Sequence, residues 1–291
     1  KPLTGSGTLY AYNGSIWFKP DNSAFDGKFA FTNNYVEVHS TSALGTTNEV
    51  WVNVQGTSNG KQIKIDRVEG PGVMSNAFYF AGNSAPAAKD QQGSRYNVLE
   101  SIKSPLRICG PVTILNNVWG KFINDASSKD YYTRYCGGIY GKGWMFGGAQ
   151  NVDSAMQIEA EVDLEGGLVA CDGNFDVRAK IKRGDLDVDS PDRTIRFFAA
   201  DLCPTNSDFN FGRVKISAAP NWGGTFDLNG FDQETGNLVT WREGMYEAPN
   251  CVITSPSNAT LTVRGCAART RDTGTIFNSF PGVLTGAVSL C

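Results

Sequence analysis

Short stretches of alternating apolar and polar residues run through almost the whole chain, and this pattern constrains the fold more than any other feature. Segments such as GTLYAYNGSIWFKP and GKFAFTNNYVEVHS are rich in β-branched and aromatic residues and stop at Gly, Asn or Pro. Such segments are typical of β-strands that end in turns, and nowhere does a 3.6-residue apolar period persist over a long segment. The sequence therefore predicts an all-β protein.

The arrangement of these strands is predicted from the usual architectures of all-β chains. The 291 residues show no internal repeat of fixed period. Chains with many short strands and turn-rich connections usually form two packed antiparallel sheets. We therefore expect an antiparallel β-sandwich or jelly roll, stabilised by disulfides, as one domain or as two packed β domains. The predicted division is an N-terminal β region at 1–85, a linker or short helix at 86–104 and a main β-sandwich region at 105–291.

Composition argues against several classes of function. The formal net charge is −3, only 19% of the residues are charged, and the Lys and Arg residues are scattered. We therefore expect no DNA or RNA partner. No stretch approaches the roughly 18 to 20 apolar residues of a membrane span. No glycine-rich phosphate-binding motif opens a helix, so no nucleotide cofactor is expected.

The seven cysteines predict disulfides rather than a zinc site, because the chain has no CxxC pair and only one histidine. The segment between Cys251 and Cys266 holds two β-rich runs around a Ser-Pro-Asn turn, so these cysteines would face each other across a hairpin. Proximity in the sequence suggests two further pairs, Cys109–Cys136 and Cys171–Cys203. Cys291 is then either free or linked to another chain. Disulfides imply an oxidising compartment, so we expect an extracellular protein or one on the surface of a cell or particle.

A row of alternating acidic residues lies in the segment MQIEAEVDLEGG. It comprises Glu159, Glu161, Asp163 and Glu165. The next segment, GNFDVRAKIKRG, has basic residues at matching alternate positions. An antiparallel hairpin would place Glu159 opposite Lys182, Glu161 opposite Lys180, and Asp163 opposite Arg178. Each such pair would contribute roughly 0.2 to 1 kcal/mol, so the row is predicted to hold a sheet together.

A second interpretation of the same row is catalytic. The pattern E-x-D-x-E at Glu161, Asp163 and Glu165 resembles the catalytic strand of the laminarinase and lichenase type of β-sandwich glycoside hydrolases. The resemblance implies Glu161 as nucleophile, Glu165 as general acid/base and Asp163 as the group that tunes them. Retaining hydrolysis would require the two glutamate carboxyl groups to lie about 5 to 5.5 Å apart.

Another acidic segment, GDLDVDSPDR, suggests a calcium site as the one cofactor to be considered. Asp187, Asp189 and Asp192 lie around its turn, and Ca²⁺ prefers such oxygen ligands. The alternative is an exposed strand edge followed by a Ser-Pro turn.

An aromatic cluster among glycines is the candidate binding site. It comprises Tyr131, Tyr132, Tyr135, Tyr140 and Trp144. Flat amphipathic rings on loops grip sugars or protein partners, although alternate rings could equally fill the core. Two N-x-[ST] sequons, at Asn13 and Asn258, would permit glycans in a eukaryotic source.

These features favour a non-enzymatic structural or adhesive subunit of an extracellular assembly such as a fibre, pilus, coat or capsid. The reasons are the scarcity of catalytic residues, the many β edges and the odd terminal cysteine. Its expected partners are copies of itself or other subunits, and glycans are a further candidate. The alternatives are a retaining glycoside hydrolase and a lectin-like carbohydrate-binding module.

Overall fold

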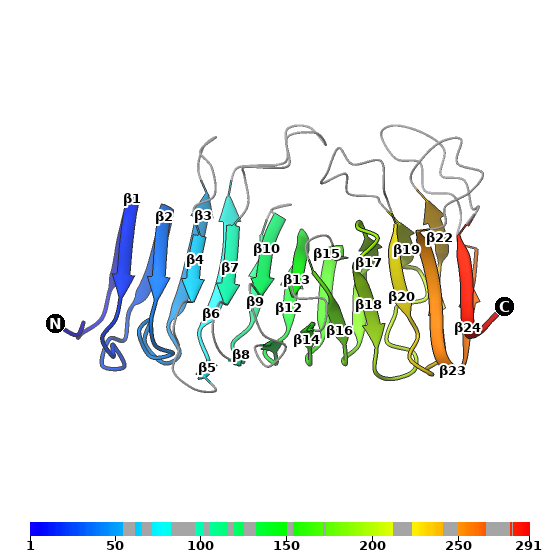
Figure 1. Ribbon diagram of the computed structural model, residues 1–291. Helices are drawn as coiled ribbons and strands as arrows, with labels where there is room; N and C mark the ends of the chain where they lie inside the picture. The colour runs from blue at the N-terminus through cyan, green and yellow to red at the C-terminus, as the bar shows by residue number, and fades with distance from the viewer. Residues whose placement is uncertain are drawn as a thin grey trace.

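The computed structural model describes most of the chain. The described residues are 1–54, 62–65, 72–82, 97–101, 105–115, 119–124, 132–149, 154–170, 173–211, 223–240, 250–265, 280 and 282–291. The chain coils around a long axis, with successive coils lying side by side from the N-terminus to the C-terminus (Figure 1). The fold is a parallel β-solenoid with three faces.

The first face begins each coil. Four short strands belong to it alone: β3 (Glu49–Val54), β6 (Ala77–Gly82), β9 (Val112–Ile114) and β12 (Ile139–Gly141). Four longer strands run from the first face onto the second: β1 (Thr8–Phe18), β2 (Lys28–Val38), β15 (Val162–Ala170) and β17 (Ile181–Val188). These long strands join the two faces, because β2 pairs through its first half with β3 and through its second half with β4.

The second and third faces complete each coil. The second face contains β4 (Gln62–Ile65), β7 (Asn97–Ser101), β10 (Trp119–Asn124), β13 (Trp144–Ala149), β19 (Asp208–Phe211) and β22 (Asn237–Thr240). The third face contains β5 (Gly72–Met74), β8 (Leu106–Ile108), β11 (Thr133–Tyr135), β14 (Met156–Ile158), β16 (Phe175–Val177), β18 (Thr194–Phe197) and β20 (Gly224–Asp227). The last coils add β21 (Gln233–Thr235), β23 (Cys251–Val263) and β24 (Val283–Leu290).

The all-β prediction is confirmed, but the antiparallel β-sandwich or jelly roll is wrong. Every ladder between two of the described strands is parallel, for example Val162 with Ile181 in β15 and β17. A solenoid strand has one side in the core and one in solvent, as a sandwich strand has, so the local alternation of residues does not reveal strand direction. No fixed repeat is visible because the coils differ in length, from 18 residues between Gly167 and Asp185 to 36 between Gln62 and Val98.

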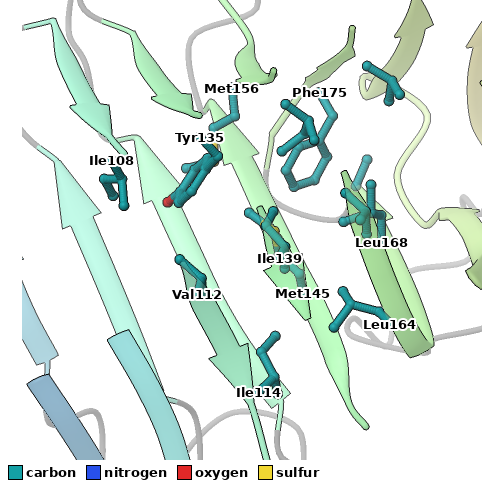
Figure 2. Packing of buried hydrophobic residues seen from close by; sticks show 14 of the residues in the cluster. Ile108, Val112, Ile114, Tyr135, Ile139, Met145, Met156, Leu164, Leu168 and Phe175 are labelled. Carbon is teal, nitrogen blue, oxygen red and sulfur yellow. The ribbon is translucent and has the colours of Figure 1, made fainter. Parts of the chain in front are cut away.

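The core consists of apolar side chains stacked at equivalent positions of successive coils. On the first face, one inward row passes through seven buried residues: Phe29, Val50, Phe78, Val112, Ile139, Val162 and Ile181. Figure 2 shows side chains from the first and third faces meeting inside the coil, with Ile108 and Tyr135 on one side and Val112 and Ile139 on another. This stacking buries the apolar half of each alternating segment.

A corner of buried asparagines and glycines fixes the turn from the third face to the first. The side-chain amide of Asn76 donates to the carbonyls of Leu44 (2.9 Å) and Asn48 (3.1 Å), which belong to the preceding coil. In the next coil the equivalent position is Gly110, where an added Cβ would lie 2.0 Å from the Asn76 carbonyl oxygen. The coils therefore approach each other too closely at this corner for a side chain at that position.

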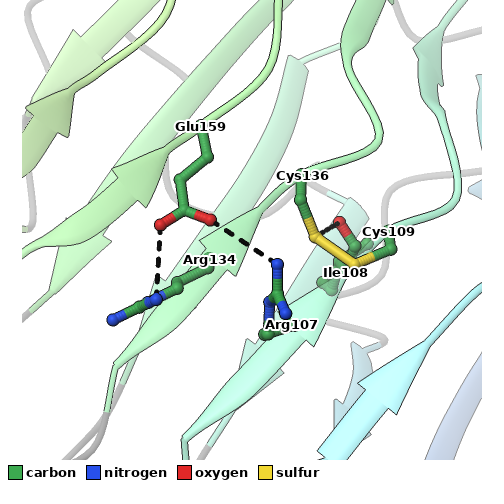
Figure 3. Close-up of a disulfide and its surroundings, with 6 residues drawn as sticks. All are labelled: Arg107, Ile108, Cys109, Arg134, Cys136 and Glu159. Carbon is green, nitrogen blue, oxygen red and sulfur yellow. Dashed lines mark hydrogen bonds and ion pairs between the residues drawn. A yellow bond between two sulfur atoms is a disulfide. The ribbon is translucent and has the colours of Figure 1, made fainter.

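The disulfide Cys109–Cys136 is confirmed and links two neighbouring coils (Figure 3). Its cysteines follow β8 and β11, which pair in parallel with Ile108 beside Tyr135. The predicted pairing of Cys251 with Cys266 across a hairpin is wrong, because 251–263 is a single strand and Cys251 is a buried free cysteine. Cys266 itself lies outside the described residues.

The two remaining cysteine predictions concern the pair Cys171–Cys203 and the odd cysteine Cys291. Cys203 is buried and free, so the predicted pair with Cys171, which lies outside the described residues, is not formed; Cys291 is free and exposed.

Strands of the two predicted β regions pair directly, since β6 lies beside β9. The described part of 86–104 is strand β7 rather than a helix. No helix among the described residues is long and apolar enough to cross a membrane.

The disulfide should contribute substantially to stability, because it closes a loop with a sequence separation of 27 residues. In the chain-entropy model a loop of this size corresponds to about 3.5 kcal/mol. We expect the double variant Cys109→Ser/Cys136→Ser to lose about 2 to 4 kcal/mol of unfolding free energy in urea titrations. Cys291→Ser, which removes an exposed free thiol, is the matched control and should leave the midpoint unchanged. Equal midpoints for the wild type and the double variant would contradict this role.

Candidate functional site

One outward-facing row on the first face crosses eight successive strands at a single register position. In order along the axis it contains Tyr10, Ala30, Trp51, Tyr79, Thr113, Tyr140, Asp163 and Arg183. Its first six positions hold four aromatic residues, which we call the aromatic row: Tyr10, Trp51, Tyr79 and Tyr140. Its last two positions are charged. At most positions the row arises because an outward residue lies between two inward apolar residues, as in the segments VWV and FYF.

The aromatic row presents its rings to solvent. Tyr10 is 80% exposed and Tyr140 is 37% exposed, while Trp51 and Tyr79 are partly buried by each other. The rings of Trp51 and Tyr79 stack with centroids 4.5 Å apart and planes 11° apart. Because these two residues lie on adjacent strands, their ring planes stand across the solenoid axis. These two rings therefore stand as parallel slabs and do not lie flat on the sheet.

A charged pair borders the aromatic row. Lys28 Nζ lies 2.8 Å from Glu49 Oε2, and the indole of Trp51 donates a hydrogen bond of 3.0 Å to the same carboxylate oxygen. The hydrogen bond that Lys28 donates to Glu49 lowers the pKa of Glu49 and raises the pKa of Lys28. Both groups are therefore held in their charged forms beside the rings.

The acidic row predicted from the sequence is divided between two faces. Glu161, Asp163 and Glu165 lie on the first face, but Glu159 falls at the end of β14 on the third face. There Glu159 lies 3.5 Å from Arg134 Nη1 and 4.0 Å from Arg107 Nη2 (Figure 3). The chain turns a corner between β14 and β15, so a single strand through the whole row does not form.

The predicted antiparallel charge ladder is also wrong in its register, although most of the acidic residues have basic neighbours. In the parallel pairing of β15 with β17, Asp163 lies opposite Arg183 and bonds to it, and Lys182 Nζ lies 3.5 Å from Asp163. The same ammonium lies 4.0 Å from Glu161. Glu165 lies 3.5 Å from Lys142, from the preceding coil. The acidic and basic residues thus connect neighbouring coils.

The catalytic roles of Glu161, Asp163 and Glu165 stay a prediction, but the fold that the resemblance implies is wrong. A retaining hydrolase of the type that the motif resembles needs Glu161 and Glu165 on a curved strand of an antiparallel sandwich, and that fold is not present. The hydrogen bond from Arg183 lowers the pKa of Asp163, which favours its charged form. Each of the three carboxylates lies beside a cation of an adjacent coil, an arrangement that suits ion pairing between strands.

The predicted cluster of aromatic residues among glycines is dispersed over all three faces. Tyr135 is buried in the core, and Tyr132 lies on the third face with the Arg134 guanidinium 4.5 Å from its ring centroid. Trp144 begins β13 on the second face, and Tyr131 lies outside the described residues. Only Tyr140 belongs to the aromatic row.

The remaining predicted sites are not assembled into a common centre. Asp187 is buried on the second face, whereas Asp189 and Asp192 follow it toward the turn before β18. Within the described parts of the chain, no group of three His, Cys, Asp or Glu residues is placed to hold a metal ion. Asn258 is exposed on β23, and Asn13 lies in β1; their glycosylation stays a prediction.

Sequence reasoning missed three members of the aromatic row. Tyr10, Trp51 and Tyr79 are separated by 41 and 28 positions in the sequence, so nothing local connects them. The available signal was the shared pattern of an outward ring between two inward apolar residues. It becomes informative only when the segments are known to stack in parallel.

No family model, no curated protein and no solved structure matches this chain. The function must be argued from the geometry of the molecule itself. That geometry offers an exposed line of rings bordered by a charged pair.

The charged end of the outward row should make stability depend on pH. The folded-state pKa of Asp163 is lowered, so its stabilising contribution is present above the unfolded value of about 4 and is lost as the pH falls through the folded value. We expect Asp163→Asn to lower unfolding free energy by roughly 0.5 to 1 kcal/mol at pH 7, with the difference shrinking below pH 4. Asp26→Asn, in the loop before β2, is the control. A difference that stays constant with pH would argue against the ion pair.

Proposed function

We propose that the protein is an extracellular, non-enzymatic adhesive subunit that binds a neutral polysaccharide through the aromatic row of the first face. The observation that carries this proposal is the alignment of Tyr10, Trp51, Tyr79 and Tyr140 at one register position, all pointing outward. Outward rings on a half-exposed sheet give no core packing, so their repetition along one row favours a role in recognition.

The chemistry of the aromatic row supports a carbohydrate ligand. Aromatic rings provide apolar surfaces for the C–H faces of sugars, and a few polar groups at the edge then fix orientation through hydroxyl groups. Lys28 and Glu49 supply such polar groups beside Trp51. Tyr10 and Tyr140 are separated by five strand spacings, or about 24 Å. A polymer that lies along the solenoid axis would contact the whole row, whereas one small sugar would contact only part of it.

The environment of the nearby carboxylates supports binding rather than hydrolysis. Glu161 and Asp163 share Lys182, and Glu165 is paired with Lys142. Cleavage of a glycosidic bond needs one carboxylic acid that keeps its proton near neutral pH. The pKa of Asp163, which lies between the two glutamates in the motif, is instead lowered by the hydrogen bond from Arg183.

Two further features support an extracellular assembly. The disulfide is typical of proteins that fold in an oxidising compartment. At the C-terminal end, Leu284 and Leu290 occupy positions in register with the buried Ile253 and Leu261, yet they are 42% and 50% exposed. Among the described strands β24 pairs only with β23, so its outer edge and these leucines fit a coil of a second copy.

Removal of the stacked rings should weaken polysaccharide binding. We expect Trp51→Ala and Tyr79→Ala each to reduce affinity about tenfold or more, equivalent to about 1.4 kcal/mol, because each removes one face of the stacked pair. Affinity electrophoresis in gels containing hydroxyethylcellulose, laminarin, galactan or dextran measures this. Trp17→Ala, which removes a 59% exposed ring outside the row, is the matched control.

The same polymers test the absence of catalysis. The wild type should bind at least one of them without releasing reducing ends. Release of reducing ends that is lost in Glu161→Gln would overturn the non-enzymatic part of the proposal, and a failure to bind any polymer would overturn the whole.

The exposed outer edge of β24 should drive self-association. We expect the wild type to show concentration-dependent oligomers in sedimentation velocity, and Leu284→Lys/Leu290→Lys to shift the distribution toward monomer because it places charges on the contact. Thr285→Lys, on the same strand at an outward position, is the control. Identical distributions for all three proteins would count against assembly through this edge.

A further inference from the structure

Ala30 interrupts the aromatic row between Tyr10 and Trp51. Its strand pairs with both of theirs, and the three residues share one register position. The strands of Tyr10 and Trp51 are therefore two spacings, or about 9.6 Å, apart. Rings on directly adjacent strands of this row stack at 4.5 Å, as Trp51 and Tyr79 do. A ring placed over the Ala30 methyl group would thus lie at stacking distance from both neighbours, so the gap has the width of one missing ring.

A polar edge borders this gap. Lys28 lies two residues before Ala30 on the same strand and points to the same side. Its ammonium group bonds to Glu49, which also accepts from the indole of Trp51. Tyr79 and Tyr10 add smaller electrostatic contributions to the raised pKa of Lys28, after the main one from Glu49. The ammonium group therefore borders the gap over Ala30, where it can donate to a ligand held between the rings.

The arrangement recurs once along the row. Thr113 lies between Tyr79 and Tyr140, again with its small side chain outward between two ring-bearing strands. The two gaps are three strand spacings, or about 14 Å, apart. One linear polymer along the axis could place a ring in each gap at the same time, which would raise its affinity over that of a single ring.

We propose that the gaps over Ala30 and Thr113 are two subsites for pyranose rings of one neutral polysaccharide chain. This inference rests on the proposed function of the first face and specifies how the ligand is held. A pyranose has apolar C–H faces for the flanking rings and hydroxyl groups at its rim for Lys28 and Glu49. A nucleic acid also has rings that stack, but it needs a track of free cations for its phosphates. The ammonium group beside the Ala30 gap is already paired with Glu49.

A substitution that fills a gap with a ring distinguishes two separate subsites from one continuous binding surface. Ala30→Phe would insert a ring between Tyr10 and Trp51 in the way that Tyr79 stacks on Trp51. We expect this variant to keep or raise the thermal midpoint, because the added ring completes the stack, and to lose at least tenfold in affinity for the polymer that the wild type binds. Thr113→Phe should behave in the same way. Thr262→Phe, on β23 beside β21 and away from the aromatic row, is the matched control and should bind like the wild type.

A second variant covers the case in which Ala30→Phe fails to fold. Tyr10→Ala removes an 80% exposed ring and opens the first gap on one side without disturbing the core. Its affinity should fall at least threefold. Oligosaccharides of the bound polymer give an independent measurement: affinity should rise steeply once they are long enough to span about 14 Å, the distance between the gaps.

The outcomes separate this inference from the function on which it rests. If Ala30→Phe and Thr113→Phe fold and bind the polymer as well as the wild type or better, the subsites are overturned and binding by the first face still stands. If the wild type binds none of the four polymers, the proposed function fails and the subsites fail with it. Salt-sensitive binding of poly(dT) that Ala30→Phe abolishes would assign the gaps to nucleic acid bases instead.

Discussion

Parallel stacking of equivalent side chains is the interaction on which the whole structure depends. Each coil places an apolar residue directly over an apolar residue of the previous coil, as Phe29, Val50 and Phe78 do on the first face. A slip of one residue in any strand would turn its core side chains toward solvent, so the register is strongly constrained. The asparagine and glycine corner adds a second constraint, because the amide of Asn76 bonds to two carbonyls of the preceding coil.

The same register that builds the core also builds the outer surface. Once Val50 and Val52 point inward, Trp51 must point outward, and it then stacks on the equivalent residue Tyr79. Asp163 meets Arg183 by the same rule. The surface of a solenoid is therefore a set of straight rows with a spacing of about 4.8 Å. Such rows suit extended ligands, which is why we propose a polysaccharide and not a small metabolite as the ligand of the first face.

The failed predictions have a common physical cause. The acidic row was assigned to one strand of an antiparallel hairpin, whereas the chain turns a corner after Ile158 and Glu159 joins Arg134 on another face. The predicted tyrosine cluster was divided by the same corners. Neighbouring residues in the sequence are separated whenever a corner lies between them, and a corner made by a few residues of ordinary turn composition has no distinctive pattern. Complementary charge was nonetheless a sound guide to contact, since Glu161 and Asp163 do meet Lys182.

The sequence by itself determined the all-β class, the inward and outward sides of most strands, and the proximity of Cys109 to Cys136, because these depend on alternation and on short separations. Only the tertiary structure decided that the strands are parallel, and which outward residues share a row. Coil lengths vary from 18 to 36 residues, so the positions of Tyr10, Trp51, Tyr79 and Tyr140 follow no period that spacing could disclose. Their alignment exists only because the core brings unequal coils into one register.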